Sequence, residues 1–111
     1  MSWRITFHGP KLEEEILALP AGFVARFIRY AERMETYGPD LGMPHTRAMG
    51  GGLFELRLSS REGIARVFYC TVVGRRIVML HQFVKKTDKT PRKELEIAER
   101  RMKEAKDELD T

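Results

Sequence analysis

The stretch IARVFYCTVVGRRIVMLHQFVKK, residues 64–86, predicts the centre of a β-sheet. Its two apolar runs are rich in β-branched and aromatic residues, which favour strands. Between the runs lies Gly74, and a glycine at the first turn position suits a two-residue hairpin. Most residues of both runs are apolar, whichever face of a strand they would occupy. We therefore expect the runs to pair as buried strands of one antiparallel sheet.

Segments on the N-terminal side of this hairpin predict two further strands. LFELRL, residues 53–58, alternates apolar and polar residues, and WRITF, residues 3–7, does so over a shorter length. GPDLGMPHTRAMGGG, residues 38–52, is rich in Gly and Pro and is expected to form a long loop, a type of segment that is often functional. The three strands after this loop therefore form an antiparallel meander in the predicted fold.

Three segments predict amphipathic helices. Residues 11–19 and 23–37 are separated by the helix-breaking sequence Pro-Ala-Gly, and we expect a helical hairpin that covers one face of the sheet. A third helix follows Thr90, a candidate N-cap, and Pro91, which suits the first helical position. The apolar positions expected to face the core are Leu12, Ile16 and Leu19, then Val24, Phe27, Ile28, Ala31 and Met34, and finally Leu95, Ala98, Met102, Ala105 and Leu109.

Length and composition indicate one globular domain over residues 1–111. Hydrophobic residues make up 42% of the chain and charged residues 32%, which argues against disorder. The single cysteine, Cys70, cannot form an intrachain disulfide and fits a reducing compartment. We see no signal peptide, and no stretch approaches the roughly 18 apolar residues that span a bilayer. We therefore expect a cytoplasmic protein that does not enter the membrane.

Positive charge is concentrated where the last predicted strand gives way to the last helix. The chain holds 20 Lys and Arg against 16 Asp and Glu, a net charge of +4. Residues 85–93 hold five of these bases and one acid, which leaves 15 bases and 15 acids elsewhere. The five bases are Lys85, Lys86, Lys89, Arg92 and Lys93. Such a patch suits a polyanion such as nucleic acid, and a solvated basic turn is an equally good interpretation.

Charged residues also interrupt the predicted strands. Glu55 and Arg57 are two residues apart and share a face of their strand. Because burial under helices would be costly, we expect them on the open face of the sheet, where an exposed ion pair is the simplest interpretation. Arg66 lies within the most apolar strand. It either pairs with an acid such as Glu55 or binds phosphate through its planar guanidinium group.

The histidines do not predict a metal site. His8, His45 and His81 lack the spacing of metal ligands, so we expect neither a metal nor another cofactor. His81 lies inside a strand and is expected to be a hydrogen-bonded structural residue. His45 lies in the long loop, where a role as acid or base is easier to imagine.

A cationic cleft for a phosphate chain is the remaining candidate. Neighbouring strands can bring Arg57, Arg66 and the Lys85-Lys86 pair near one another on one sheet face. RNA carries its own nucleophile, the ribose 2′-hydroxyl. A metal-free cleft could cleave RNA by aligning that hydroxyl, moving protons and stabilising the charged phosphorane-like state.

The blocks LFELRL, RVFY, IVMLHQFVKKTDKTP and KELEIAERR, in this order, resemble the RelE/HigB-type toxins of bacterial toxin–antitoxin systems. The chain is most similar to the phage-derived HigB-like branch. The resemblance implies a compact α+β fold with a curved antiparallel sheet, an N-terminal helical hairpin on one face, a concave site on the other and a C-terminal helix. It also implies an endoribonuclease that cuts mRNA on the ribosome through 2′-hydroxyl attack, leaves a cyclic phosphate, and is neutralised by an antitoxin, which we expect to be of helix-turn-helix type.

The resemblance also implies roles for individual residues. Arg57 matches a basic strand position, Arg66 matches an arginine that helps to hold the phosphate, and Lys86 matches a basic residue implicated in the chemistry. Glu55 stands where RelE has a lysine, and another branch uses an acidic general base. The base is therefore Glu55, His45 or Lys86. The exposed bases Lys85, Lys89, Arg92 and Lys93 are expected to form the mouth of the RNA-binding cleft.

Two other functions stay open. The last tyrosine of this chain is Tyr69, so the C-terminal tyrosine of RelE has no counterpart. One alternative is an RNA-binding module that does not cleave. The other is a non-catalytic toxin of the same fold that binds a protein target such as gyrase. Arg57, Arg66 and Lys86 favour the nuclease, because a protein binder has no need for a phosphate cradle.

Overall fold

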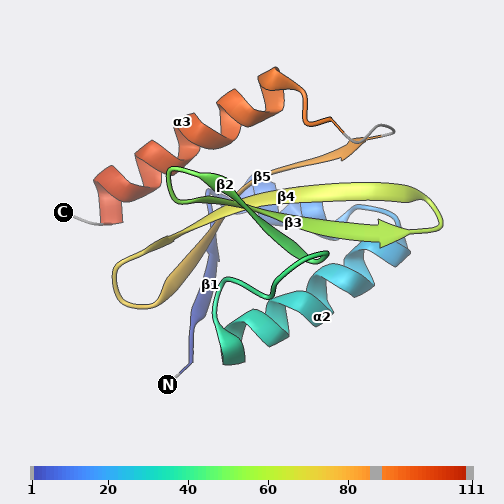
Figure 1. Ribbon diagram of the computed structural model, residues 1–111, viewed down its shortest axis with the longest axis horizontal. Coiled ribbons are helices and arrows are strands. Elements are labelled where there is room, and N and C mark those ends of the chain that lie inside the picture. The colour runs from blue at the N-terminus through green and yellow to red at the C-terminus, as the bar shows by residue number, and fades with distance from the viewer. Residues whose placement is uncertain (1, 86–88, 110–111) are drawn as a thin grey trace.

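The computed structural model describes residues 2–85 and 89–109 and has the predicted α+β architecture (Figure 1). In chain order the elements are β1 (Arg4–Phe7), α1 (Pro10–Leu17), α2 (Ala21–Tyr37), β2 (Thr46–Gly50), β3 (Leu53–Ser60), β4 (Gly63–Val72), β5 (Arg76–Lys85) and α3 (Arg92–Leu109). The strands form one five-stranded sheet in the order β1-β5-β4-β3-β2. Strand β1 runs parallel to β5, and the other neighbours are antiparallel.

The β4–β5 hairpin lies at the centre of the sheet, as its sequence predicts. Both strands are ten residues long, and the last pair before the turn is Val72 with Arg76. Residues 73–75 therefore form the turn, so the predicted two-residue turn is wrong and the turn has three residues. Gly74 and Arg75 have φ angles of +81° and +56°. Glycine adopts a positive φ angle without steric cost, which accounts for Gly74 in this turn.

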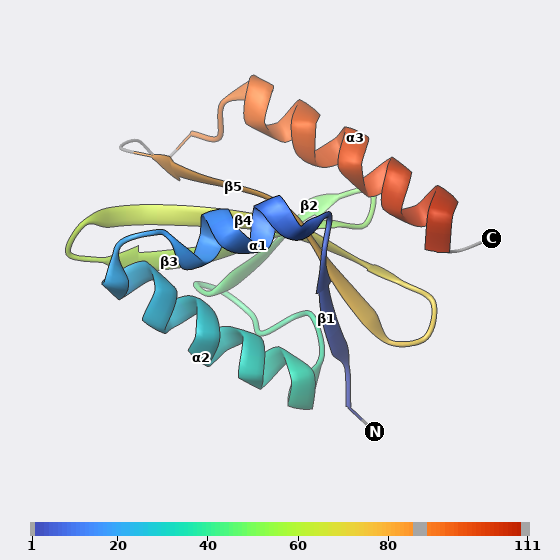
Figure 2. The same cartoon turned by 180° about the vertical axis from the view of Figure 1, so that it is seen from behind.

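Helices cover both faces of the sheet. Helices α1 and α2 lie on one face and α3 on the other, as the two opposite views show (Figures 1 and 2). Buried residues accordingly divide into two clusters, one packed with α1 and α2 and the other with α3. The expectation that Glu55 and Arg57 lie on an open face is therefore wrong, because α3 covers the face that these residues share.

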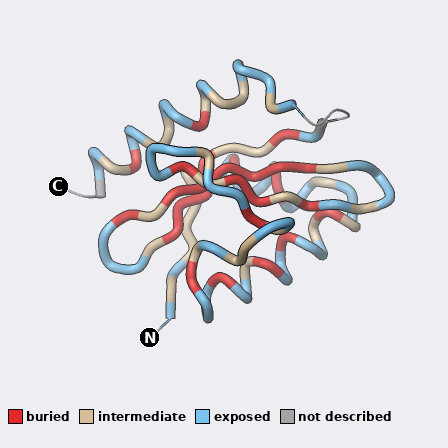
Figure 3. The backbone as a smooth tube through the Cα atoms, in the orientation of Figure 1, coloured by how far each residue is buried: buried red, intermediate tan, exposed pale blue. Residues whose placement is uncertain are grey.

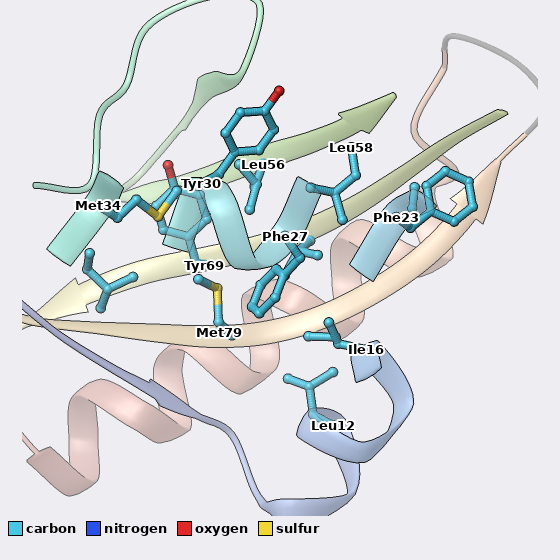
Figure 4. Close-up of a cluster of buried hydrophobic side chains, with 13 residues drawn as sticks. Leu12, Ile16, Phe23, Phe27, Tyr30, Met34, Leu56, Leu58, Tyr69 and Met79 are labelled. Atoms are coloured by element: carbon cyan, nitrogen blue, oxygen red, sulfur yellow. The ribbon is translucent and has the colours of Figure 1, made fainter. Parts of the chain in front are cut away.

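The α1/α2 side of the core shows which stripe of α2 is buried (Figure 4). Phe23, Phe27, Tyr30 and Met34 are buried and follow a spacing of four, three and four residues. Ile28 is 46% exposed, so its predicted place in the core is wrong. The aromatic stripe is buried because Phe and Tyr remove more apolar area from water than Val, Ile and Ala in the neighbouring stripe.

Helix α3 covers the second face with a narrow apolar stripe. Ala98 and Ala105 are buried against the sheet, and Leu95 and Met102 pack beside them. Leu109 was expected in this stripe, and its side chain lies outside the described part of the chain. Most of the remaining surface of α3 is exposed (Figure 3). No helix within the described residues is long and apolar enough to cross a membrane.

The segment 38–52, predicted to be a loop, contains the edge strand β2. Its Thr46 is 1% exposed and anchors the entrance to the strand. The Thr46 hydroxyl accepts a hydrogen bond from the Leu41 amide at 3.0 Å and donates one to Asp40 Oδ1 at 3.2 Å. The strand was missed because its pairing with β3 supplies backbone hydrogen bonds that local composition does not reveal.

Candidate phosphate-binding site between the sheet and α3

Glu55 and Arg66 form a buried ion pair beneath α3. The pairing of β3 with β4 sets Glu55 opposite Phe68 and Arg57 opposite Arg66, so Glu55 lies diagonally across from Arg66. Arg66 Nε lies 3.6 Å from Glu55 Oε2, and each side chain is 2% exposed. This distance is that of an ion pair and is too long for a hydrogen bond. The sequence left two roles for Arg66, pairing with an acid or binding phosphate, and the structure contains the pair with Glu55.

The positive charge of this cluster exceeds its negative charge. Arg57 and Arg66 lie directly opposite each other, and like charges in this position repel. Arg57 Nε and Arg66 Nε and Nη1 are buried, and none has a hydrogen-bond partner among the described residues. Buried donors without partners cost free energy, particularly on charged groups. The cluster therefore offers one unbalanced positive charge and several free N–H donors to an anion.

Aromatic rings of β4 and β5 lie beside Arg66. Phe83 of β5 pairs with Arg66 in the sheet register. The ring of Phe83 stacks on Phe68 at 5.6 Å and on His81 at 6.2 Å between ring centroids. These rings keep the dielectric constant near the guanidinium group low, which strengthens its attraction for an anion.

Three hydrogen bonds join α3 and the residues before it to the cluster and to β5. Thr90 Oγ1 donates to Glu55 Oε2 at 3.2 Å, His81 Nε2 lies 2.7 Å from Glu94 Oε2, and Arg101 Nη1 donates to the Leu80 carbonyl at 2.9 Å. The expectation of a hydrogen-bonded His81 is thus confirmed. Thr90 does not act as the predicted N-cap, because its hydroxyl binds Glu55. The first helical hydrogen bonds of α3 are instead accepted by the Pro91 carbonyl. Because α3 begins at Arg92, Pro91 precedes the helix and does not occupy its predicted first position.

Thr90 and Glu94 are site residues that the sequence did not reveal. Thr90 fits a capping pattern, and Glu94 is one of many acids on a charged helix. The hydrogen bonds that they form span 35 and 13 residues of sequence. No local signal distinguishes these contacts, because they depend on how α3 packs against the sheet.

The remaining predicted residues do not all meet at this cluster. The ring of His45 lies 4.8 Å from the ring of Tyr30 on α2, which covers the opposite face, so His45 is not joined to Arg66. Lys86 lies outside the described residues, and so does the side chain of Lys85. Lys89, Arg92 and Lys93 are exposed at the start of α3, where Arg92 Nε lies 3.2 Å from Glu96 Oε1.

Tyr69 does not replace the C-terminal tyrosine of RelE. It lies in the core on the α1/α2 side, stacks on Phe54 and donates a hydrogen bond to the Pro39 carbonyl. Burial raises the pKa of the Tyr69 hydroxyl well above its usual range. This hydroxyl therefore stays protonated at neutral pH and lies on the wrong face to act beside Arg66.

The hydrogen bond between Thr90 and Glu55 should stabilise the closed cluster. Thr90→Val keeps the shape of the side chain and removes the donor, so we expect the free energy of unfolding to fall by about 1.5–3 kcal/mol, the range for hydrogen bonds to charged groups. The measurement is denaturant unfolding. Thr36→Val, at an exposed position of α2, is the control and should change stability by less than about 0.5 kcal/mol. Equal values for the two variants would contradict a contribution from this hydrogen bond.

Comparison with protein families identifies a family that this chain matches. A family model described as "Phage derived protein Gp49-like (DUF891)" matches residues 14–103 of the 111-residue chain. The matched region begins in α1 and ends in α3, so it includes the whole candidate site. Comparison with the curated proteins gives no match.

Proposed function

We propose, because the chain belongs to the Gp49-like family of phage-derived, HigB-like toxins, that it is the toxin of a toxin–antitoxin system and cleaves mRNA on the translating ribosome. The observation that supports cleavage best is the cluster of Glu55, Arg57 and Arg66. Glu55 pairs with Arg66, Arg57 lies opposite Arg66 in the sheet, and three guanidinium nitrogens of the two arginines have no hydrogen-bond partner among the described residues. A phosphate group would balance the charge and accept these hydrogen bonds.

The proposed reaction needs only groups on the RNA and on the chain. The ribose 2′-oxygen attacks the scissile phosphorus, the bond from phosphorus to the 5′-oxygen breaks, and a cyclic phosphate and a 5′-hydroxyl remain. Among the described candidates for the general base, Glu55 is the one in contact with Arg66, so we assign it to remove the 2′-hydroxyl proton. Arg57 and Arg66 stabilise the charge that develops on the phosphate oxygens. The leaving 5′-oxygen must take up a proton. With Glu55 assigned as the base, we propose Lys86, which the family resemblance implicates in the chemistry, as the proton donor.

RNA can contact Arg66 only after a rearrangement. Glu55 and Arg66 are each 2% exposed, and Thr90 and Glu94 join the segment above them to the sheet. In the proposed mechanism the start of α3 moves away from the sheet when the toxin binds its substrate. The exposed bases Lys89, Arg92 and Lys93 lie in the moving part and would follow the RNA backbone.

Expression of the chain without a partner should arrest growth by stopping translation. The physical reason is that each cleaved message can no longer be translated, so even slow cleavage is enough to stop protein synthesis. Incorporation of labelled methionine should fall before DNA synthesis does, and sequencing of ribosome-associated transcripts should reveal new 5′ ends. A partner protein of helix-turn-helix type, encoded beside the toxin, should restore growth when it is co-expressed.

The alternatives give different results in this experiment. Growth arrest with intact mRNA and damaged DNA would support a gyrase-binding toxin and contradict the nuclease. RNA binding without new 5′ ends would support a non-cleaving RNA-binding module. A variant with Arg57 and Arg66 both changed to Gln should lose toxicity. Because Arg66 is buried and paired with Glu55, this loss supports action of the cluster on the target only if a thermal melt shows that the variant is folded.

A further inference from the structure

A second basic feature lies outside the candidate site, between the first turns of α2 and the β3–β4 turn. Both views place these two segments beside each other (Figures 1 and 2). Residues of both segments line a cavity of about 420 Å³, including Arg26 and Arg29 of α2 and Arg61 of the turn. We call this feature the α2 groove. Its lining also includes Gly22, Ala25, Ser60 and Glu62.

The arginines of the α2 groove are not neutralised by the protein. Arg26, Arg29 and Arg61 are exposed, and no hydrogen bond or ion pair joins them to the residues that the structure describes. Glu62 is the acid in the lining, and its carboxylate already accepts a hydrogen bond from Ser60 Oγ at 2.7 Å. The groove therefore has a net charge of +2, from three arginines and one glutamate.

The start of α2 adds backbone donors to the same groove. The helix has no side-chain cap, and the first amides bonded to the Pro20 carbonyl are those of Phe23 and Val24. The amide of Gly22, which comes earlier in the chain, therefore forms no hydrogen bond within the helix and lies at the positive end of the helix dipole. A Cβ atom at Gly22 would lie 2.9 Å from Glu62 Oε2 and 3.1 Å from Ser60 Cβ. Glycine thus allows helix and turn to approach closely.

We propose that the α2 groove binds backbone phosphates of an RNA chain, as a second contact surface separate from the cleavage cluster. Arginine guanidinium groups and helix-start amides are the donors that phosphate prefers. The proposal rests on the proposed function for the identity of the polyanion. It does not require that Glu55 or Arg66 take part in chemistry.

The arrangement fits a nucleic acid better than an acidic peptide. Arg26, Arg29 and Arg33 recur every three or four residues on one face of α2 and span about 10 Å, so they form a row of cations that can follow a continuous chain of phosphates. Arg57 of the cleavage cluster precedes Ser60 by three residues in the same strand, a distance of about 10 Å. One RNA chain could therefore pass around this end of the sheet and contact both sites.

The test compares two variants with the same change in net charge. The groove variant replaces Arg26, Arg29 and Arg61 by Gln, and the control replaces Arg4, Lys11 and Arg100, which are also exposed. Binding of a fluorescent 2′-O-methyl RNA, which cannot be cleaved, is measured by anisotropy over a range of salt concentrations. Loss of three phosphate contacts should lower the slope of log K against log salt by about 2, and the control should lower it by less than about 0.5.

The outcomes separate the groove from the nuclease. Equal slopes for the two variants would overturn the proposal, and so would displacement of the RNA by polyglutamate at equal charge concentration, which would indicate an acidic protein partner. A wild-type protein that does not cleave RNA but shows the expected difference in slope supports the groove and contradicts only the proposed function. Thermal melts should show both variants folded, because the changed side chains are exposed. Arg29→Gln alone, with an expected change in slope of about 0.7, provides a milder version of the same test.

Discussion

Arg66→Lys is expected to lower the rate of RNA cleavage by a factor of about 10²–10³, the loss seen when one preorganised donor of an active site is removed. Lysine keeps the positive charge beside Glu55 but lacks the planar fork that binds two phosphate oxygens at once. Because Arg66 is almost fully buried, the missing donors cannot be replaced by an exposed neighbour. The measurement is single-turnover cleavage of ribosome-bound mRNA, with a thermal melt of the same preparation.

Arg4→Lys is the control for this experiment, since Arg4 is exposed on β1 and has no part in the cluster. Its cleavage rate should equal that of the wild-type protein. Full activity in a folded Arg66→Lys protein would remove Arg66 from the mechanism. An unfolded Arg66→Lys protein would support a purely structural pair, because loss of one partner from a buried ion pair costs about 3–5 kcal/mol. Binding of the antitoxin should be largely unchanged in the folded variant.

Phe27→Ala is expected to lower the free energy of unfolding by about 3–5 kcal/mol, the usual loss for removing a buried aromatic side chain. Phe27 is 4% exposed in the core between α2 and the sheet, and its ring lies 6.2 Å from that of Phe7. The substitution leaves a cavity that the surrounding strands cannot fill without shifting. Denaturant unfolding measures the effect.

Ile28→Ala is the matched control, at the next position of the same helix. Ile28 is 46% exposed, so its truncation should cost less than about 1 kcal/mol. The pair of variants tests which stripe of α2 faces the sheet. A larger loss for Ile28→Ala than for Phe27→Ala would show that the helix is rotated relative to the structure.

Local patterns were enough to predict most elements. The alternation in residues 53–58 identifies β3, because successive side chains of a strand point to opposite faces. The two short apolar runs, rich in β-branched and aromatic residues, identify β4 and β5. Prolines and glycines mark the ends of α1 and α2. The edge strand β2 was not predictable in this way, since its exposed residues do not alternate and its structure comes from pairing with β3.

The features of the candidate site also fall into those that the sequence could predict and those that it could not. The sequence by itself determined the family resemblance, the unusual arginine within an apolar strand and the basic segment before the last helix, because these are properties of residue type and order. Only the tertiary structure decided that Glu55 and Arg66 are buried, that Thr90 and Glu94 close the cluster, and that three arginines gather at the α2 groove. The physical reason is that burial and pairing depend on contacts between distant segments. The docking of α3 on one face of the sheet and of α2 on the other sets those contacts, and neither docking is encoded in any short stretch of the chain.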